Sequence, residues 1–250
     1  MEQKMFERLK KVADEIKKAK SVAVLTGAGI SKASGIPTFR DKDGLWKKFS
    51  FSQFATYQAF RKNPKEVWSW YNYRKKIIKQ AKPNPAHEAL AELEQRFKEN
   101  FTLITQNIDN LHYLAGNRNI IELHGNIFKV KCTICDRVYT DDKIYSEEEL
   151  PPKCKYCGGL LRPFVVWFGE NLDRDLLDEA IKSATSDVFL CIGTSGAVQP
   201  AASLPKIAHD MGRFVAEFNI DYSGISIYAD EVVIAEVTES LPQLIKLLDS

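Results

Sequence analysis

Short apolar runs alternate with amphipathic segments along most of the chain. Four runs have the composition of buried strands and a weaker fifth follows them, at residues 22–25, 101–104, 188–192, 214–218 and 232–234. Between them, apolar residues recur at helical spacing over residues 5–17, 86–98, 174–184 and 201–211. Because buried strands that alternate with amphipathic helices form parallel sheets covered on both faces, the pattern predicts an α/β fold with a Rossmann-like, doubly wound parallel sheet.

Two stretches interrupt this alternation. Residues of about 36–85 are rich in aromatic and basic side chains and mostly helical in pattern, whereas residues of about 126–162 contain four cysteines. We interpret both as inserts that together form a smaller lobe. The larger lobe then comprises residues of about 18–35, 86–125 and 163–250, and the groove between the lobes is a natural ligand site.

Polar or glycine-rich segments follow four of the predicted strands, at residues 26–29, 105–109, 193–195 and at Asn219. In doubly wound sheets, ligands bind beyond the carboxyl ends of the strands, so these segments predict a nucleotide site. The first of them contains Gly27 and Gly29, but Lys32 stands where the dinucleotide fingerprint has its third glycine. That departure argues against an ordinary dehydrogenase, and taken alone the two glycines could form a structural turn.

The cysteines predict a metal site. Cys132 and Cys135 form one Cys-x-x-Cys pair, and Cys154 and Cys157 form a second pair after 18 intervening residues. This spacing is typical of a zinc ribbon, and a cytosolic chain of this length has no need of disulfide bonds. Four thiolates complete a tetrahedral shell, so we expect one structural Zn²⁺ with no open position for water. Cys191 lies in an apolar run and is expected to be a small buried hydrophobe.

Composition narrows the possible partners. The chain of 250 residues has a formal net charge of +2 and 44% apolar residues, which is ordinary for a soluble protein. No apolar run approaches the ~20 residues that span a bilayer, and the N-terminus lacks the features of a secretory signal. We therefore expect a cytoplasmic protein without a membrane partner. The lysines near the cysteines are offset by acidic residues, so direct binding of nucleic acid is not expected.

A set of longer motifs is much more specific. They read Gly-Ala-Gly-Ile-Ser at 27–31, Gly-Ile-Pro-Thr-Phe-Arg at 35–40, Asp-Gly-Leu-Trp at 43–46, Thr-Gln-Asn-Ile-Asp-Asn-Leu-His at 105–112, His-Gly at 124–125, Val-Val-Trp-Phe-Gly-Glu at 165–170 and Gly-Thr-Ser at 193–195. In these residues, in this order and over roughly residues 20–220, the chain resembles the sirtuin (Sir2) family of NAD-dependent deacylases. The resemblance implies that residues 1–250 form a single sirtuin catalytic unit.

The resemblance also implies the chemistry. His124 matches the family's catalytic histidine, although a lone histidine is more often structural, and an imidazole with an ordinary pKa near ~6.5 can act as a base at neutral pH. The implied reaction uses NAD and yields free lysine, nicotinamide and O-acyl-ADP-ribose. His112 is expected to orient local structure, and His87 and His209 are expected on helix surfaces.

The family's cofactor site maps onto many positions of this chain. Asn107 and Asp109 match the residues that line the nicotinamide pocket, and Phe39 is expected to shield the reacting carbon from water. Near the adenine, the family often has a Gly-Lys-Ala-Gly-like loop, whereas residues 235–238 read Ala-Glu-Val-Thr, so backbone contacts are expected there. The residues that the resemblance assigns to NAD are Gly27, Ala28, Gly29, Ser31, Thr38, Phe39, Arg40, Trp46, Gln106, Asn107, Ile108, Asp109, Gly193, Thr194, Ser195, Asn219, Ile220, Asp221 and Val237.

Tyr71 and Arg74 are the most informative local detail for the substrate. Their i, i+3 spacing places both on one helix face, where an Arg fork and a Tyr hydroxyl could bind a carboxylate. Taken alone, such a pattern more often belongs to a packed aromatic helix with a solvated arginine. However, the pair resembles the sirtuin subclass that removes succinyl and malonyl groups, and Ala55 fits the widened acyl pocket of that subclass. We therefore predict activity on acetyl, succinyl and malonyl groups.

Acyl-lysine proteins or peptides are the expected partners. Phe168, Gly169 and Glu170 match the edge where sirtuins hold the substrate as an added strand, which gives affinity with little sequence selectivity. Val166 and Trp167 are expected to line the channel for the lysine stem. The facing loop is expected near residues 196–198.

Two other functions remain open from the sequence. One is a mono-ADP-ribosyltransferase that uses the same cofactor site. The other is a non-catalytic zinc-ribbon module on chromatin or DNA, which the near-neutral charge disfavours.

Overall fold

The large lobe is built on a six-stranded parallel sheet. The computed structural model describes residues 2–38 and 51–250. Strand order is β3-β2-β1-β7-β8-β9, so the chain winds outward in both directions from the neighbours β1 and β7. This confirms the predicted doubly wound sheet and places its switch point between those two strands. The strands are β1 (Val22–Thr26), β2 (Phe101–Thr105), β3 (Ile120–Glu122), β7 (Val188–Ile192), β8 (Phe214–Asn219) and β9 (Glu231–Ile234).

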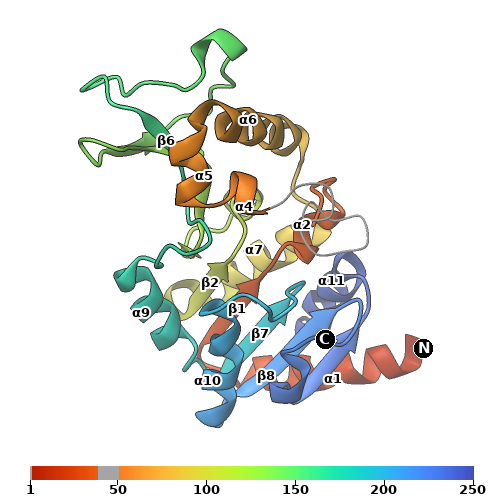
Figure 1. The fold of residues 1–250 in the computed structure, drawn as a ribbon. Helices are drawn as coiled ribbons and strands as arrows, with labels where there is room; N and C mark the ends of the chain where they lie inside the picture. Colours follow the sequence, from red (N-terminus) through yellow and green to blue (C-terminus); the bar gives the residue numbers. More distant parts are fainter. Residues whose placement is uncertain (1, 39–50) are drawn as a thin grey trace.

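Helices bury both faces of this sheet (Figure 1). Val22 and Val24 of β1 point into one apolar cluster, and Ala23 and Leu25 point into the other. Because successive strand residues face opposite sides, a strand that is covered twice must be apolar throughout, as β1 is. One face is covered by α1 (Glu2–Lys18), α7 (Pro85–Phe97) and α11 (Val237–Leu248), and the other by α9 (Arg174–Ser183) and α10 (Leu204–Asp210).

The small lobe combines the two predicted inserts. Its three-stranded antiparallel sheet packs against α6, whose first residue Pro64 follows the cap Asn63. Trp68 of α6 donates from its indole nitrogen to the carbonyl of Leu161 at 2.8 Å, which joins the helical insert to the cysteine-containing one. The elements are α4 (Phe51–Phe54), α5 (Tyr57–Lys62), α6 (Pro64–Gln80), β4 (Gly125–Cys132), β5 (Val138–Thr140) and β6 (Leu161–Val165).

The remaining helices are short. Helix α2 (Gly29–Lys32) follows β1, and α8 (Leu111–Ala115) follows β2. Single 3₁₀ turns occur at Lys98–Asn100, Glu147–Glu149, Ala201–Ser203 and Ser226–Tyr228. Among the helices of the described residues, none has both the length and the apolar character needed to cross a membrane.

Three features of the fold differ from the sequence expectations. Strand β3 and helix α11 were not predicted, and the segment around Val237 opens that helix instead of continuing a loop. His87 was expected on a helix surface, and that prediction is wrong. Its side chain is fully buried, and its Nδ1 accepts from the backbone N–H of Asn84 as part of a capping box at the start of α7. His209 is exposed, as expected.

Candidate active site

One cavity of about 1170 Å³ lies between the lobes, beyond the carboxyl ends of β1, β2, β7 and β8. It brings together every predicted catalytic, cofactor and substrate residue that the structure describes. Phe39, Arg40 and Trp46 lie outside the described residues. The predicted residues that line the cavity are Gly27, Ala28, Gly29, Ser31, Thr38, Ala55, Tyr71, Arg74, Gln106, Asn107, Ile108, Asp109, His124, Val166, Trp167, Phe168, Gly169, Gly193, Thr194, Ser195, Asn219, Ile220, Asp221 and Val237.

At the switch point, the main chain at Gly27 and Gly29 packs directly against the main chain at Gly193. A Cβ on Gly29 would lie 2.8 Å from the Cα of Gly193, and a Cβ on Gly27 would lie 2.8 Å from the Gly193 carbonyl oxygen. Gly193 itself has φ +58°, in the left-handed region that favours glycine. The glycines are therefore fixed by packing as well as by any ligand, and they leave main-chain groups exposed at the cavity wall.

Side chains at the strand ends tie neighbouring strands together. The Gln106 amide after β2 donates to Thr194 Oγ1 at 2.9 Å, and the Asn219 amide at the end of β8 donates to the Thr194 carbonyl at 3.0 Å. Thr194 follows β7, so it is the shared partner of both. These polar side chains therefore have hydrogen-bond partners within the protein itself.

Ser31, Asn107 and Asp109 form a hydrogen-bonded network in the wall of the cavity. Ser31 Oγ donates to Asp109 Oδ2 at 2.7 Å, and the Asn107 amide donates to Ser31 Oγ at 3.3 Å and to the Gly27 carbonyl at 3.0 Å. Burial raises the pKa of Asp109, although the backbone N–H of Leu111 and Ser31 both stabilise its charged form.

Two buried histidines lie near this network, and one of them contacts it. His87 Nε2 lies 3.4 Å from Ser31 Oγ, and burial lowers the pKa of His87 to about 4. His112 is buried with its Nε2 2.9 Å from Thr26 Oγ1, which is the structural position expected of it. Both rings are therefore neutral at physiological pH and act as fixed hydrogen-bonding groups.

His124 lies at the centre of the cavity wall, immediately after β3. Its Nδ1 is 3.1 Å from the carbonyl oxygen of Gln106. A carbonyl oxygen can only accept, so Nδ1 carries the ring proton and Nε2 keeps a lone pair. Burial lowers the pKa of His124, while the bond to Gln106 partly offsets this. The imidazole is thus held neutral and oriented, in the form that a general base requires.

Tyr71 and Arg74 occupy the small-lobe end of the cavity, both buried on α6. Tyr71 Oη accepts from the indole nitrogen of Trp167 at 2.8 Å, and burial raises the pKa of Tyr71 to about 12. Arg74 stacks on Trp70, with its Cζ 5.0 Å from the ring centroid. Burial lowers the pKa of Arg74, and the nearby Tyr71 and Asp109 counteract that effect. The structure therefore places a buried cation beside a neutral phenol, and this excludes the alternative of a solvated arginine.

The predicted peptide-binding segment runs along one rim. The backbone N–H of Phe168 donates to the Ala55 carbonyl at 2.9 Å, and the N–H of Val166 donates to the His124 carbonyl at 3.0 Å. The Phe168 ring is 40% exposed. Val198, in the loop expected to face this segment, also lines the cavity.

The four paired cysteines converge at the far end of the small lobe. Their Sγ atoms all lie within 4.8 Å of one another. A tetrahedral Zn²⁺ with Zn–S bonds of about 2.3 Å separates its sulfurs by roughly 3.8 Å, so the cluster fits one such ion. Cys132 and Cys154 are buried, and Cys191 is fully buried in the large lobe as expected.

Several cavity residues were not assigned from the sequence. Trp70 and Ile78 of α6, Leu172 after β6 and Tyr222 after β8 all line the cavity. Glu170 also lines it, and the contacts of this side chain could not be predicted from the motif at 165–170 alone.

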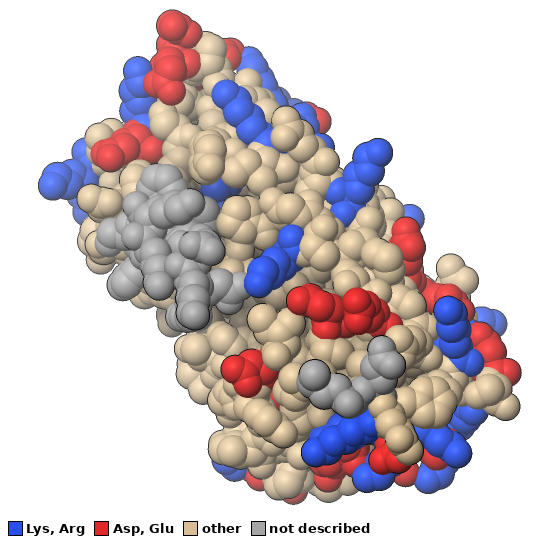
Figure 2. Space-filling view, turned by 90° about the vertical axis from the view of Figure 1, so that its right-hand side faces the viewer, with Lys and Arg blue, Asp and Glu red and all other residues tan. Residues whose placement is uncertain are grey.

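Charge on the surface is mixed. On the face that Figure 2 shows, basic and acidic side chains of the described residues are interspersed. This distribution follows from the near-balanced composition of 35 basic and 33 acidic residues.

Comparison with known proteins gives a consistent result. A sequence model described as "Sir2 family" matches residues 27–200. NAD-dependent protein deacylase 1 of Caldanaerobacter subterraneus subsp. tengcongensis is 52% identical over 214 residues, covering 85% of this chain and 88% of the relative. A structure of a mutant Sir2 homologue with ADP-ribose superposes with a TM-score of 0.91 at 43% identity, covering 96% of each chain. A structure described as Sir2 with p53 peptide and NAD⁺ gives a TM-score of 0.83 at 34% identity, covering 94% of this chain and 96% of the other.

Proposed function

This chain belongs to the Sir2 family, and from that premise we propose that it removes acyl groups from lysine side chains of proteins in a reaction that consumes NAD. One observation carries the proposal. A single cavity joins glycine-lined strand ends, a neutral oriented histidine and a buried arginine–tyrosine pair. A simple binding module would need no such combination of a nucleotide edge with a base.

The strand-end edge has the properties of an NAD site. Gly27, Gly29 and Gly193 line this edge of the cavity, where the absence of side chains would let a pyrophosphate approach the main chain. Thr194 and Asn219 lie further along the same edge, where they would contact phosphate and the adenosine ribose, with Val237 near the adenine. Asn107 and Asp109 would hold the nicotinamide end. When bound, NAD supplies the electrophilic ribose carbon that accepts the acyl oxygen as nicotinamide leaves.

His124 would act as the base. Its Nε2 lone pair faces the cavity because Nδ1 is fixed on the Gln106 carbonyl. It would take the proton of the ribose hydroxyl that NAD presents to the acyl carbon. One water is consumed overall, and the products would be free lysine, nicotinamide and O-acyl-ADP-ribose. The lowered pKa of His124 keeps the base available to below pH 6.5.

Zinc would have a purely structural role here. Cys132, Cys135, Cys154 and Cys157 would supply four thiolates and close the coordination shell. The ion would hold the small sheet together, and proton transfer would remain with His124.

The acyl end favours negatively charged groups. A carboxylate on the acyl chain could pair with Arg74 and accept from the Tyr71 hydroxyl. An acetyl group is small enough to enter but offers no carboxylate to Arg74 and Tyr71, so succinyl and malonyl groups should be preferred over acetyl. The acyl-lysine peptide would lie along residues 168–170 as an added strand, which predicts little dependence on its sequence, and its lysine stem would pass Val166 and Trp167.

The decisive experiment incubates the zinc-loaded protein with NAD and matched peptides that carry acetyl-, malonyl-, succinyl- or unmodified lysine. We expect nicotinamide and O-acyl-ADP-ribose in equal amounts with each acyl peptide and none with the unmodified one. His124→Ala is the matched control and should lower turnover by about 10²- to 10⁴-fold while keeping the fold. Label transfer from NAD onto protein without dependence on acyl-lysine would instead identify an ADP-ribosyltransferase.

A further inference from the structure

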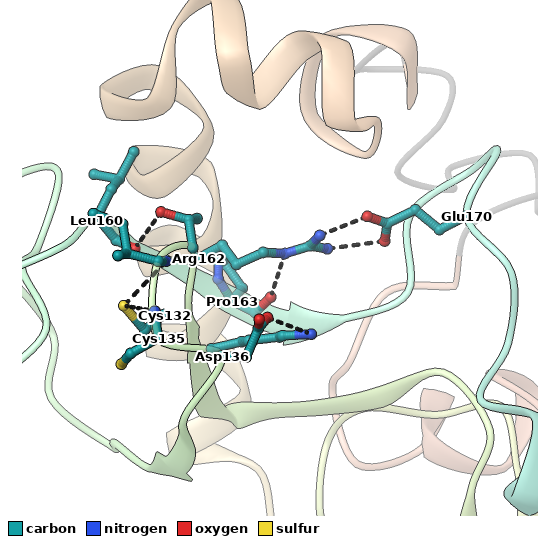
Figure 3. Close-up of polar contacts among 10 residues, drawn as sticks. Cys132, Cys135, Asp136, Leu160, Arg162, Pro163 and Glu170 are labelled. Atoms are coloured by element: carbon teal, nitrogen blue, oxygen red, sulfur yellow. Dashed lines mark hydrogen bonds and ion pairs between the residues drawn. The ribbon is translucent and has the colours of Figure 1, made fainter.

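Arg162 of β6 does not line the cavity, and each of its side-chain nitrogens donates a hydrogen bond within the protein. Nη1 and Nη2 bind the two carboxylate oxygens of Glu170 at 2.5 and 2.9 Å, as Figure 3 shows. Nη2 also donates to the Val165 carbonyl at 3.0 Å, and Nε donates to the Pro163 carbonyl at 3.4 Å. The pair is bidentate and partly buried, with side-chain exposures of 14% and 25%. Such geometry is far more specific than that of an ordinary surface ion pair.

This ion pair encloses Trp167. The Arg162 guanidinium lies over the indole, with its Cζ 3.7 Å from the ring centroid. Glu170 Oε2 accepts from the backbone N–H of Trp167 at 2.9 Å, and Phe60 packs nearby with its ring centroid 5.2 Å from that of Trp167. The indole is 2% exposed, so both its plane and its main chain are fixed. We call Arg162 and Glu170 the Trp167 clamp.

The clamp reaches the acyl end through one hydrogen bond. The Trp167 indole nitrogen lies 2.8 Å from Tyr71 Oη. An indole N–H can only donate, so the phenol oxygen must accept there. A hydroxyl has a single proton, and this contact leaves that proton to be donated to another group. The bond from Trp167 thus leaves the Tyr71 hydroxyl proton available to a partner in the cavity, which Tyr71 lines.

We propose that Arg162 and Glu170 are positioning residues for acyl selectivity: they hold the Trp167 indole so that Tyr71 presents its proton to a carboxylate on the acyl chain. The proposal rests on the proposed deacylase function and adds two residues that touch neither the acyl group nor the reacting atoms. Loosening the clamp lets the indole turn away from Tyr71, and the hydroxyl then loses its fixed direction. An acidic acyl group depends on that direction, whereas an acetyl group does not.

A double-mutant cycle tests this on the zinc-loaded protein. Arg162→Met keeps the side-chain length but removes the fork and the stacked cation. We expect it to lower the ratio of kcat/KM for succinyl peptide over acetyl peptide by about ten-fold, the loss of one hydrogen bond to a charged group. In a Tyr71→Phe background the same substitution should change the ratio by less than about two-fold, since there is no hydroxyl left to orient.

Arg61→Met, an exposed arginine on α5 of the same lobe, is the matched control and should leave the ratio unchanged. If Arg162→Met lowers both activities equally, or lowers the ratio by the same factor with and without the Tyr71 hydroxyl, the clamp is only structural and the proposal is overturned. If Arg162→Met does not fold, Glu170→Gln carries the same test, because it weakens the ion pair and keeps an acceptor for the Trp167 N–H.

Different results would contradict the acidic-acyl activity and the role of the Trp167 clamp. Deacetylation without any cleavage of succinyl or malonyl peptides would remove the acidic-acyl part of the proposed function, and this proposal with it. Preference for succinyl that survives Arg162→Met intact would overturn this proposal alone.

Discussion

The two ends of the active-site cavity are built from different materials. The cofactor end consists of main chain and small polar side chains at the strand ends, where Gly29 and Gly193 touch backbone to backbone. The acyl end consists of large side chains, Tyr71 and Arg74 from α6 and Trp167 from the peptide rim. At the cofactor end, a single added methyl group would displace the backbone. At the acyl end, side chains can be replaced one at a time, so acyl selectivity can vary while the cofactor chemistry stays constant.

Metal removal should give the largest difference between the two ends. The acyl end depends on the small lobe, which would be held by four cysteines around one Zn²⁺, and structural zinc can contribute on the order of 10 kcal/mol to folding. We expect a strong chelator to open the small lobe to proteolysis between residues 126 and 162 and to abolish deacylation, while the large lobe stays protected.

The matched control for metal removal is Cys191→Ser, which should leave zinc content near one per chain because Cys191 lies buried in the large lobe. Full activity in protein that atomic spectroscopy shows to be metal-free would contradict the structural role.

Arg74→Met should separate the acyl groups next. Loss of a buried charged partner should lower kcat/KM for succinyl peptide by about 10- to 100-fold, while acetyl peptide should change by less than about three-fold. Steady-state kinetics with both peptides at saturating NAD checks this. Equal loss for the two peptides would mean that Arg74 supports the fold instead of reading the acyl group.

Gly29→Ala should affect the other end, by a smaller factor and without acyl selectivity. The new Cβ would lie 2.8 Å from Gly193 and force the backbone apart, which typically costs about 1–3 kcal/mol. We expect the KM for NAD to rise by about five-fold or more, equally with acetyl and succinyl peptides. Gly224→Ala is the matched control, since its Cβ would meet nothing closer than 3.6 Å. If Gly29→Ala changed the KM for NAD differently with acetyl and succinyl peptides, the two ends of the cavity would not act independently.

The smallest expected effect is a pH dependence of stability from His87. Burial holds the pKa of His87 near 4, below the value of about 6.5 expected in the unfolded chain. The unfolded state therefore binds more protons, so stability is lost as pH falls below about 6.5. Between pH 7 and 5.5 this should lower the free energy of unfolding by about 1 kcal/mol. Urea titrations check it, and His87→Gln should flatten this part of the profile; a variant with an unchanged slope would assign the effect elsewhere.

The sequence predicted the large lobe well because its signals are local. The apolar runs of β1, β2, β7 and β8 and the polar segments behind them were each readable within a few residues. Strand β3 escaped notice because it has only three residues, and α11 did so although Leu241, Leu244 and Ile245 have helical spacing around Pro242. The prediction for His87 was wrong because it considered only the position of this residue on a helix. The ring takes part in the capping box at the start of α7 and is buried there.

The acyl end was predicted only in part. The spacing of Tyr71 and Arg74 showed that they share a face, but not that the face is buried in the cavity. The link from Trp167 to Tyr71 joins residues 96 positions apart, and no local pattern encodes it. The proposed role of Arg162 could not be predicted for the same reason, because it depends on contacts with residues that no local pattern identifies.

The hold on His124 has an evolutionary consequence. The group that fixes its Nδ1 proton is the main-chain carbonyl of residue 106, whereas the Gln106 side chain binds Thr194 on the cofactor edge. Substitutions at position 106 can therefore change the affinity for the cofactor while His124 keeps its tautomer and its ring orientation, because every amino acid supplies that main-chain carbonyl. Ancestral or designed variants should tolerate replacement at this position with activity reduced but not extinguished.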